Sequence, residues 1–182
     1  MSNDYKWTIY VTCYIISIGG LLLGISANVS GAVMYFSDYF NLVSGSIEEG
    51  ITVSISMLST FIGNFYAGKL GNAIGRKKSL IIAAIFFVFC TLGSALSTNY
   101  YSFLINRFIG GLGIGISLLI VPLYIAELAP ARKRGILVSF NQLNIGLGYL
   151  IAYMLNYFVE NYFTDPNIKW LSLIHISEPT RL

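Results

Sequence analysis

Five apolar stretches, each long enough to cross a lipid bilayer, constrain this sequence more than any other feature. A transmembrane helix needs about 20 mostly apolar residues to cross about 30 Å of hydrocarbon. A soluble fold cannot hide five such stretches, because the helices would present no polar face to water. The composition agrees, since 55% of the residues are hydrophobic and only 10% are charged. We therefore predict an all-α membrane protein with helices at about 7–36, 47–67, 79–96, 101–128 and 136–159.

The charged residues gather in the predicted loops and give the bundle an orientation. Loop 68–78 contains four Lys or Arg residues and loop 129–135 contains three, whereas the loop after the first helix contains Asp38, Glu48 and Glu49 and no basic residue. Short basic loops remain on the cytoplasmic side of a membrane. We therefore expect a multi-pass protein with a cytoplasmic amino terminus.

Several functional classes are disfavoured by the same pattern. The net charge is +3, but the basic residues are distributed over short loops and form no continuous face for nucleic acid. Cys13 and Cys90 lie inside apolar stretches without the spacing of a metal site or a disulfide framework. No nucleophile, base and orienting group converge in these helices, so we expect no enzyme, no catalytic residue, no metal and no cofactor.

Small residues recur at four-residue spacing in the predicted helices. Gly20 and Gly24 form one such pair, and Gly111 and Gly115 form another. Glycine at this spacing lets two helix backbones approach closely in a membrane. Ordinary helix packing is one interpretation, and helices that slide or rock against each other are the other.

Arg107 lies about two turns into the fourth predicted helix. A charged side chain at the centre of a membrane costs on the order of 3 kcal/mol, so it is expected to face protein or a watery cavity. The alternative is that it reaches back to the extracytoplasmic surface, since it lies near the start of the helix. The sequence leaves both interpretations open.

Glu127 lies at the other end of the same helix, between the two basic loops. Its neighbours in the predicted topology are Arg76, Lys77 and Arg134. An acid among these cations predicts an ionic latch that can open and close as domains move. A static cluster of ion pairs is the alternative.

The fifth predicted helix contains a polar group within an apolar stretch. Gln142, Ile145 and Tyr149 share one helix face, and Asn141 and Asn144 lie beside Gln142. An amide donates and accepts hydrogen bonds, which suits a ligand with hydroxyl groups. Hydrogen bonding between helices explains Gln142 equally well at this stage.

The chain resembles the sugar porter family of the major facilitator superfamily from residue 7 to about residue 170. One segment, 68–77, is similar to the superfamily's loop between helices 2 and 3, although it has Asn72 where Asp is commoner. Another, 138–143, is similar to the helix 5 segment whose glutamine reaches the bound sugar. The most specific match spans the end of helix 4 and comprises Ile109, Gly111, Gly115, Tyr124, Glu127 and Arg134.

The resemblance implies a twelve-helix fold of two six-helix halves around a central sugar site, of which this chain holds the first five helices. It implies that a monosaccharide is bound by Gln142, with Asn141, Ile145 and Tyr149 beside it. It also implies a plasma-membrane location and a carboxyl-terminal half as partner. We expect the five helices alone to be inactive, because they cannot enclose a substrate.

Ser26 departs from the family pattern in a way that bears on energy coupling. The segment 19–26 is similar to the family's Gly-Gly-Leu-Leu-Phe-Gly-Tyr-Asp, but Ser26 replaces the Asp that faces the helix 4 arginine, here Arg107, in proton-coupled members. The resemblance therefore favours facilitative uniport. A proton-coupled sugar or polyol symporter and a sugar sensor that does not transport are the alternatives.

The last twelve residues, 171–182, read differently from the rest of the chain. They resemble the translation of a transposase-type sequencing adapter, and they contain the only histidine, His175. We therefore expect residues 1–170 to form the amino-terminal transmembrane half and residues 171–182 to lie outside the fold.

Overall fold

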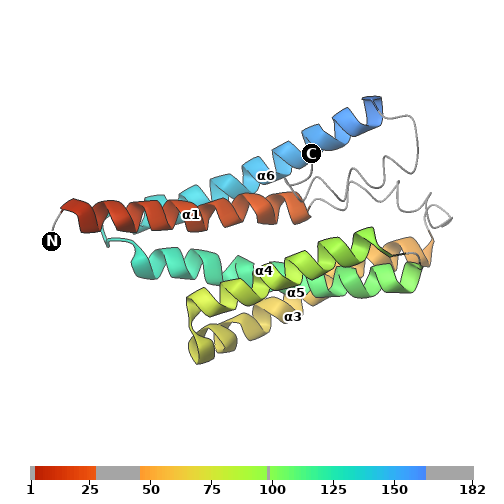
Figure 1. The fold of residues 1–182 in the computed structure, drawn as a ribbon, viewed down its shortest axis with the longest axis horizontal. Helices are drawn as coiled ribbons and strands as arrows, with labels where there is room; N and C mark the ends of the chain where they lie inside the picture. The colour runs from red at the N-terminus through yellow and green to blue at the C-terminus, as the bar shows by residue number, and fades with distance from the viewer. Residues whose placement is uncertain (1–2, 28–45, 98, 163–182) are drawn as a thin grey trace.

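The computed structural model describes residues 3–27, 46–97 and 99–162, and all regular secondary structure in these ranges is helical. Figure 1 shows the helices in two groups, with α1 beside α6 and with α3, α4 and α5 packed together. This confirms the prediction of an all-α fold. The helices are α1 (Asn3–Ala27), α3 (Ile47–Ile74), α4 (Arg76–Ala95), α5 (Tyr100–Leu128) and α6 (Arg134–Tyr162).

The junction between α3 and α4 is much shorter than the sequence predicted. We expected a loop over 68–78, but α3 continues to Ile74 and α4 begins at Arg76, which leaves Gly75 as the connection. Gly75 has a φ of 87°, a conformation that glycine adopts without a steric penalty.

The other helix ends differ less from the prediction. α1 begins at Asn3 instead of residue 7 and is described to Ala27, so the predicted residues 28–36 lie outside the described residues. α6 runs from Arg134 to Tyr162 and exceeds the predicted 136–159 at both ends. The tail 171–182 also lies outside the described residues.

Three helical segments in the described ranges are long and apolar enough to cross a membrane: Arg76–Ser94, Tyr100–Leu128 and Arg134–Phe158. α1 has a shorter apolar stretch, Ile9–Ile25. α3 contains polar residues, of which Thr52 and Ser59 are fully buried in the structure. Its lower hydropathy therefore arises partly from side chains that face other helices and not lipid.

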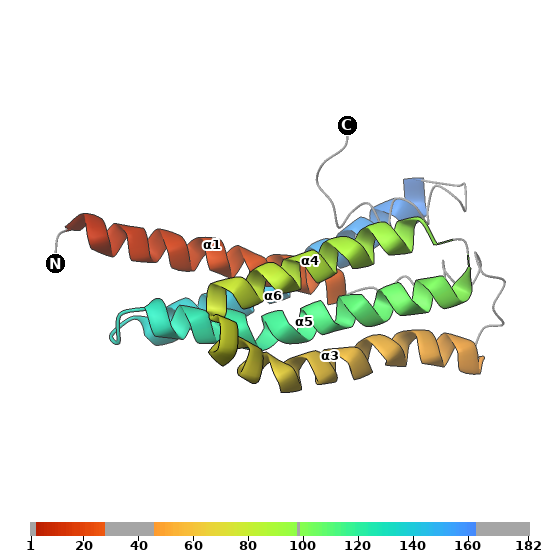
Figure 2. The same cartoon turned by 60° about the horizontal axis from the view of Figure 1, so that its bottom comes forward.

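α5 is the centre of the bundle and contacts each of the other described helices. Figure 2 shows it between α3 and α4. Large apolar side chains cover the outside of the bundle, and Phe61, Phe65 and Phe89 are each more than 60% exposed. Such a surface suits hydrocarbon and not water. Two buried clusters surround α5, one of Ala67, Ala83, Ile116 and Ile120 and one of Cys13, Val121 and Ile125.

Candidate functional site

Glycines bring α1 and α6 into backbone contact. A Cβ added at Gly24 would lie 2.9 Å from the Gly148 Cα and would overlap the Ile145 carbonyl oxygen. At Gly20 the added Cβ would lie 2.6 Å from the Asn141 Oδ1. Both positions therefore depend on the absence of a side chain.

A second glycine contact joins α5 to α3. A Cβ at Gly111 would lie 2.7 Å from the Ser56 carbonyl oxygen, and one at Gly115 would lie 2.6 Å from the Asn64 nitrogen. The structure thus places Gly20, Gly24, Gly111 and Gly115 at helix contacts.

Polar side chains accompany the glycines between α1 and α6. The Asn144 Nδ2 donates to the Ser17 carbonyl oxygen and to the Ser17 Oγ, both at 3.1 Å. Asn141 is 1% exposed, and its Oδ1 has no hydrogen-bond partner among the described residues. Sequence reasoning missed Ser17, although it precedes Gly20 and Gly24 at helical spacing on the same face of α1.

The predicted sugar-binding residues do not share one face in the structure. Gln142 and Tyr149 are exposed, whereas Asn141 is buried against Gly20 and the Ile145 side chain packs beside it. Successive residues of a helix point about 100° apart, so Asn141 can face α1 while Gln142 faces outward. The geometry therefore separates Asn141, which lies against Gly20, from Gln142, and the sugar-binding role of both residues stays a prediction.

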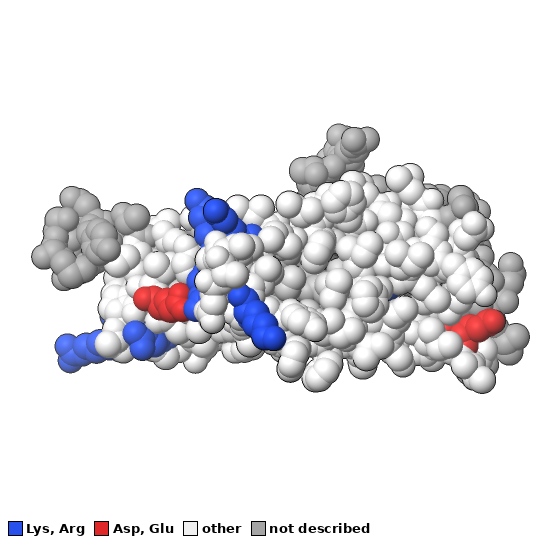
Figure 3. Space-filling model, turned by 90° about the horizontal axis from the view of Figure 1, so that it is seen from below, with Lys and Arg blue, Asp and Glu red and all other residues white. Residues whose placement is uncertain are grey.

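Arg76 and Glu127 form an ion pair at the end of the bundle where basic residues gather (Figure 3). The Arg76 Nη2 lies 2.9 Å from the Glu127 Oε1, and the Arg76 Nε donates to the same oxygen at 3.1 Å. The Arg76 Nη1 also donates to the Asn72 Oδ1 at 2.8 Å. One arginine thus connects the carboxyl ends of α3 and α5.

The other cations predicted for the latch stand apart from this pair. Lys77 and Arg134 are exposed, and neither forms an ion pair with another described residue. The Nζ of Lys133, next to Arg134, instead lies 5.2 Å from the centre of the Tyr10 ring. This contact connects the loop after α5 to α1. Among the described residues, Arg76 is therefore the predicted cation that pairs with Glu127, and the opening of this pair as a latch stays a prediction.

A hydrogen-bonded group that the sequence did not reveal joins α3 and α5 at the opposite end. The Tyr100 hydroxyl donates to the Glu48 carbonyl oxygen at 2.7 Å, and the Thr52 Oγ1 donates to the same carbonyl at 2.9 Å. The two hydroxyl oxygens lie 3.1 Å apart. The α3 and α5 pair is consequently connected by polar contacts near both of its ends.

Part of the Arg107 side chain faces the interior of the bundle. Its guanidinium carbon lies 5.9 Å from the centre of the Phe103 ring, which is the geometry of a cation–π contact. Its Nε is buried and has no hydrogen-bond partner among the described residues. Ser26 lies near the end of α1, but its side chain is outside the described residues, so the relation of Ser26 to Arg107 stays a prediction.

Apolar helices, glycine contacts and a basic end together define an integral membrane protein that crosses the bilayer several times. The sugar (and other) transporter family matches residues 12–180. This chain belongs to that family of the major facilitator superfamily and holds the first helices of its fold. The match includes most of the tail 171–182 and does not test the boundary predicted at residue 170.

Curated relatives include several sugar transporters. A D-xylose transporter of Levilactobacillus brevis is 38% identical over 81% of this chain. The D-xylose-proton symporter of Escherichia coli K12 is 37% identical over 94% of it. The chain spans 32% and 40% of the lengths of these two relatives, respectively.

The fold is similar to solved structures of the xylose transporter XylE from E. coli. An inward-open structure has a TM-score of 0.81 at 33% identity and matches 93% of this chain and 44% of that one. A structure of XylE bound to 6-bromo-6-deoxy-D-glucose has a TM-score of 0.83 at 31% identity and matches 97% and 42%, respectively.

Proposed function

We propose that this chain is the amino-terminal part of a protein that transports a monosaccharide by alternating access. The supporting observation is the family match over residues 12–180, which includes most of α1 and all of the other described helices. Transporters of this fold bind substrate between two halves that rock against each other. The carboxyl-terminal half is therefore the required partner, and the five helices alone do not transport.

The sugar contact within this chain is Gln142 on α6, with Tyr149 two turns away on the same side of the helix. Gln142 is exposed, and its amide both donates and accepts hydrogen bonds, so it can bind two sugar hydroxyls at once. Each such hydrogen bond contributes about 0.5–1.5 kcal/mol.

We therefore expect Gln142→Ala in the full-length protein to weaken sugar binding about tenfold, which corresponds to about 1.4 kcal/mol. Binding of D-xylose and D-glucose is measured by calorimetry, with Leu143→Ala as the matched control, because Leu143 is the exposed neighbour on the same helix. Equal sugar affinities for the two folded variants would show that Gln142 does not bind the sugar and would favour its role in helix packing.

We also propose that transport is facilitative uniport. A proton-coupled transporter needs a group in its pathway that gains and loses a proton, and a serine hydroxyl such as that of Ser26 does not titrate near neutral pH. Glu127, the acid near the inner end of α5, is engaged by Arg76. The alternative is proton symport, which the similarity to the D-xylose-proton symporter favours.

Liposomes that contain the full-length protein distinguish these two functions. We expect labelled sugar to equilibrate under an inward proton gradient without accumulating. A Ser26→Asp variant adds a carboxylate to α1 and is expected to remain uncoupled. Accumulation that a protonophore abolishes would refute uniport and would place the coupling acid in the carboxyl-terminal half.

A further inference from the structure

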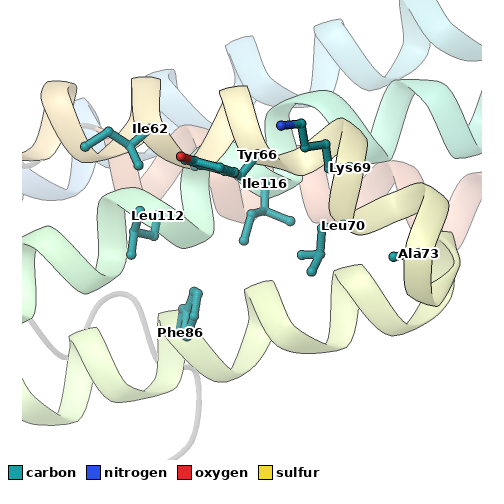
Figure 4. A pocket seen from close by; sticks show the side chains of 9 residues that line it. Ile62, Tyr66, Lys69, Leu70, Ala73, Phe86, Leu112 and Ile116 are labelled. Carbon is teal, nitrogen blue, oxygen red and sulfur yellow. The ribbon is translucent and has the colours of Figure 1, made fainter.

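An open groove of about 360 Å³ lies on the surface of the three-helix group, between α3, α4 and α5 (Figure 4). Its lining is apolar except at Lys69 and the Tyr66 hydroxyl. Its main residues are Ile62, Tyr66, Lys69 and Ala73 from α3, Phe86 from α4 and Ile116 from α5.

The groove has the shape of a site for an extended hydrocarbon chain. Of its α3 residues, Ile62, Tyr66, Lys69 and Ala73 follow one another at spacings of four, three and four, so they form a single stripe along the helix. From Ile62 to Ala73 this stripe is about 16 Å long at the rise of an α-helix. The ring of Phe65, which is 65% exposed, lies beside Tyr66 with 5.4 Å between the ring centres.

A cation lies at the rim of the groove on the side of the basic end. The Lys69 Nζ is 5.9 Å from the centre of the Tyr66 ring, so the ammonium group lies over the groove wall. Lys69 is exposed and is the cation among the residues that line the groove. An amphiphile with an anionic head and an apolar tail matches this arrangement of a positive rim and an apolar floor.

A second transmembrane helix matches the groove less well. Helices that pack in membranes approach through small residues. The groove rim instead presents the Tyr66 ring, which is 57% exposed, and the Lys69 side chain.

We propose that this groove binds an anionic phospholipid, with one acyl chain between α3 and α4 and the phosphate headgroup on Lys69. The site lies outside the α6 face that carries Gln142. It therefore differs from the proposed sugar site, and its occupation does not require sugar.

Native mass spectrometry of the full-length protein in detergent tests this proposal, with phosphatidylglycerol and phosphatidylcholine of identical acyl chains as probes. We expect phosphatidylglycerol to bind more tightly than phosphatidylcholine. Lys69→Ala is expected to weaken phosphatidylglycerol binding about fivefold, which is the contribution of one lysine near an anionic membrane surface. Lys69→Arg keeps the charge and is expected to retain binding, and Lys78→Ala is the matched control for a cation outside the groove.

A second pair of variants tests the apolar part of the site. Ala73→Phe fills the groove and is expected to weaken binding of both lipids, whereas Ala84→Phe adds the same ring to an exposed position of α4 outside the groove. Glycerol phosphate, which has the headgroup without an acyl chain, is expected not to displace the lipid.

Three results would overturn the proposal. The first is an equal loss of phosphatidylglycerol binding in Lys69→Ala and Lys78→Ala, which would indicate a diffuse basic surface. The second is unchanged lipid binding in Ala73→Phe. The third is a crosslink from Tyr66→Cys to the carboxyl-terminal half of the same protein, which would show that a helix covers the groove.

Discussion

The contact between α1 and α6 can be tested with two glycines of the same helix. Gly24 and Gly19 both lie in α1, and both can be changed to alanine, which adds one methyl group. At Gly24 the new Cβ would lie 2.9 Å from the Gly148 Cα and 2.9 Å from the Tyr149 nitrogen. At Gly19 it would meet nothing within 4 Å.

The two substitutions are expected to change stability in opposite directions. The atoms that face Gly24 belong to the α6 backbone and cannot rotate away, so the helices must separate. Such overpacking costs about 1–3 kcal/mol, whereas alanine in place of glycine at an open helical position stabilises by about 0.5–1 kcal/mol. For a chain of this size, Gly24→Ala should lower the melting temperature by about 2–12 °C and Gly19→Ala should raise it by about 1–4 °C.

Thermal unfolding of the purified chain in detergent micelles measures this difference, with a thiol-reactive dye that reports exposure of Cys13 when the other free cysteine, Cys90, is replaced by Ser in all variants. Cys13 is 1% exposed in the folded chain, so its labelling follows loss of the α1 contacts. Equal melting temperatures for Gly24→Ala and the unsubstituted chain would refute the close approach of α1 and α6.

Two further predictions concern the basic end and the orientation. The Arg76 and Glu127 side chains are 21% and 44% exposed, so solvent weakens their attraction. A double-mutant cycle with Arg76→Gln and Glu127→Gln should therefore give a coupling free energy of only about 0.2–1 kcal/mol in thermal unfolding. A coupling free energy near zero would show that the pair does not stabilise the fold. Cysteines introduced at Ser44 and Asn161 should react with an impermeant thiol reagent on intact cells, whereas a cysteine at Asn72 should not, and labelling at Asn72 would reverse the proposed topology.

The sequence predicts those features that depend on local spacing. Apolar stretches predicted the five described helices, although only three of them contain a segment whose length and hydropathy suffice for a membrane span. Glycines at four-residue spacing identified the α1 and α5 faces that make the close contacts with α6 and α3, since this spacing puts the glycines on one face. The proximity of Arg76 and Glu127 followed from the topology, because adjacent loops on one side of the membrane meet at one end of the bundle.

The remaining features depend on partners that are distant in the sequence. Asn144 and Ser17 are 127 residues apart, and Tyr100 reaches the Glu48 carbonyl across 52 residues. Periodicity shows that a polar residue interrupts an apolar face, but it does not show which helix supplies the partner. For the same reason Asn141 was placed with Gln142, when the structure turns it toward Gly20.

The distribution of contacts bears on how this half would move in the proposed transport cycle. α3 and α5 are joined by hydroxyls of Thr52 and Tyr100 at one end, by Arg76 at the other and by close backbone contacts at Gly111 and Gly115 between them. Sliding one helix along the other would break all of these contacts together, because the backbones leave no room for side chains to adapt.

α1 and α6 form a second tightly packed pair through Gly24 and Gly148, and the cluster of Cys13, Val121 and Ile125 joins this pair to α5. Both helix groups therefore resist internal sliding and are held to each other through α5. In the proposed transport cycle, the rocking motion that exposes the sugar site to alternate sides of the membrane would therefore take place between this half and the carboxyl-terminal half. The ion pair of Arg76 and Glu127 at the basic end can open at a low cost, because its side chains are 21% and 44% exposed to solvent.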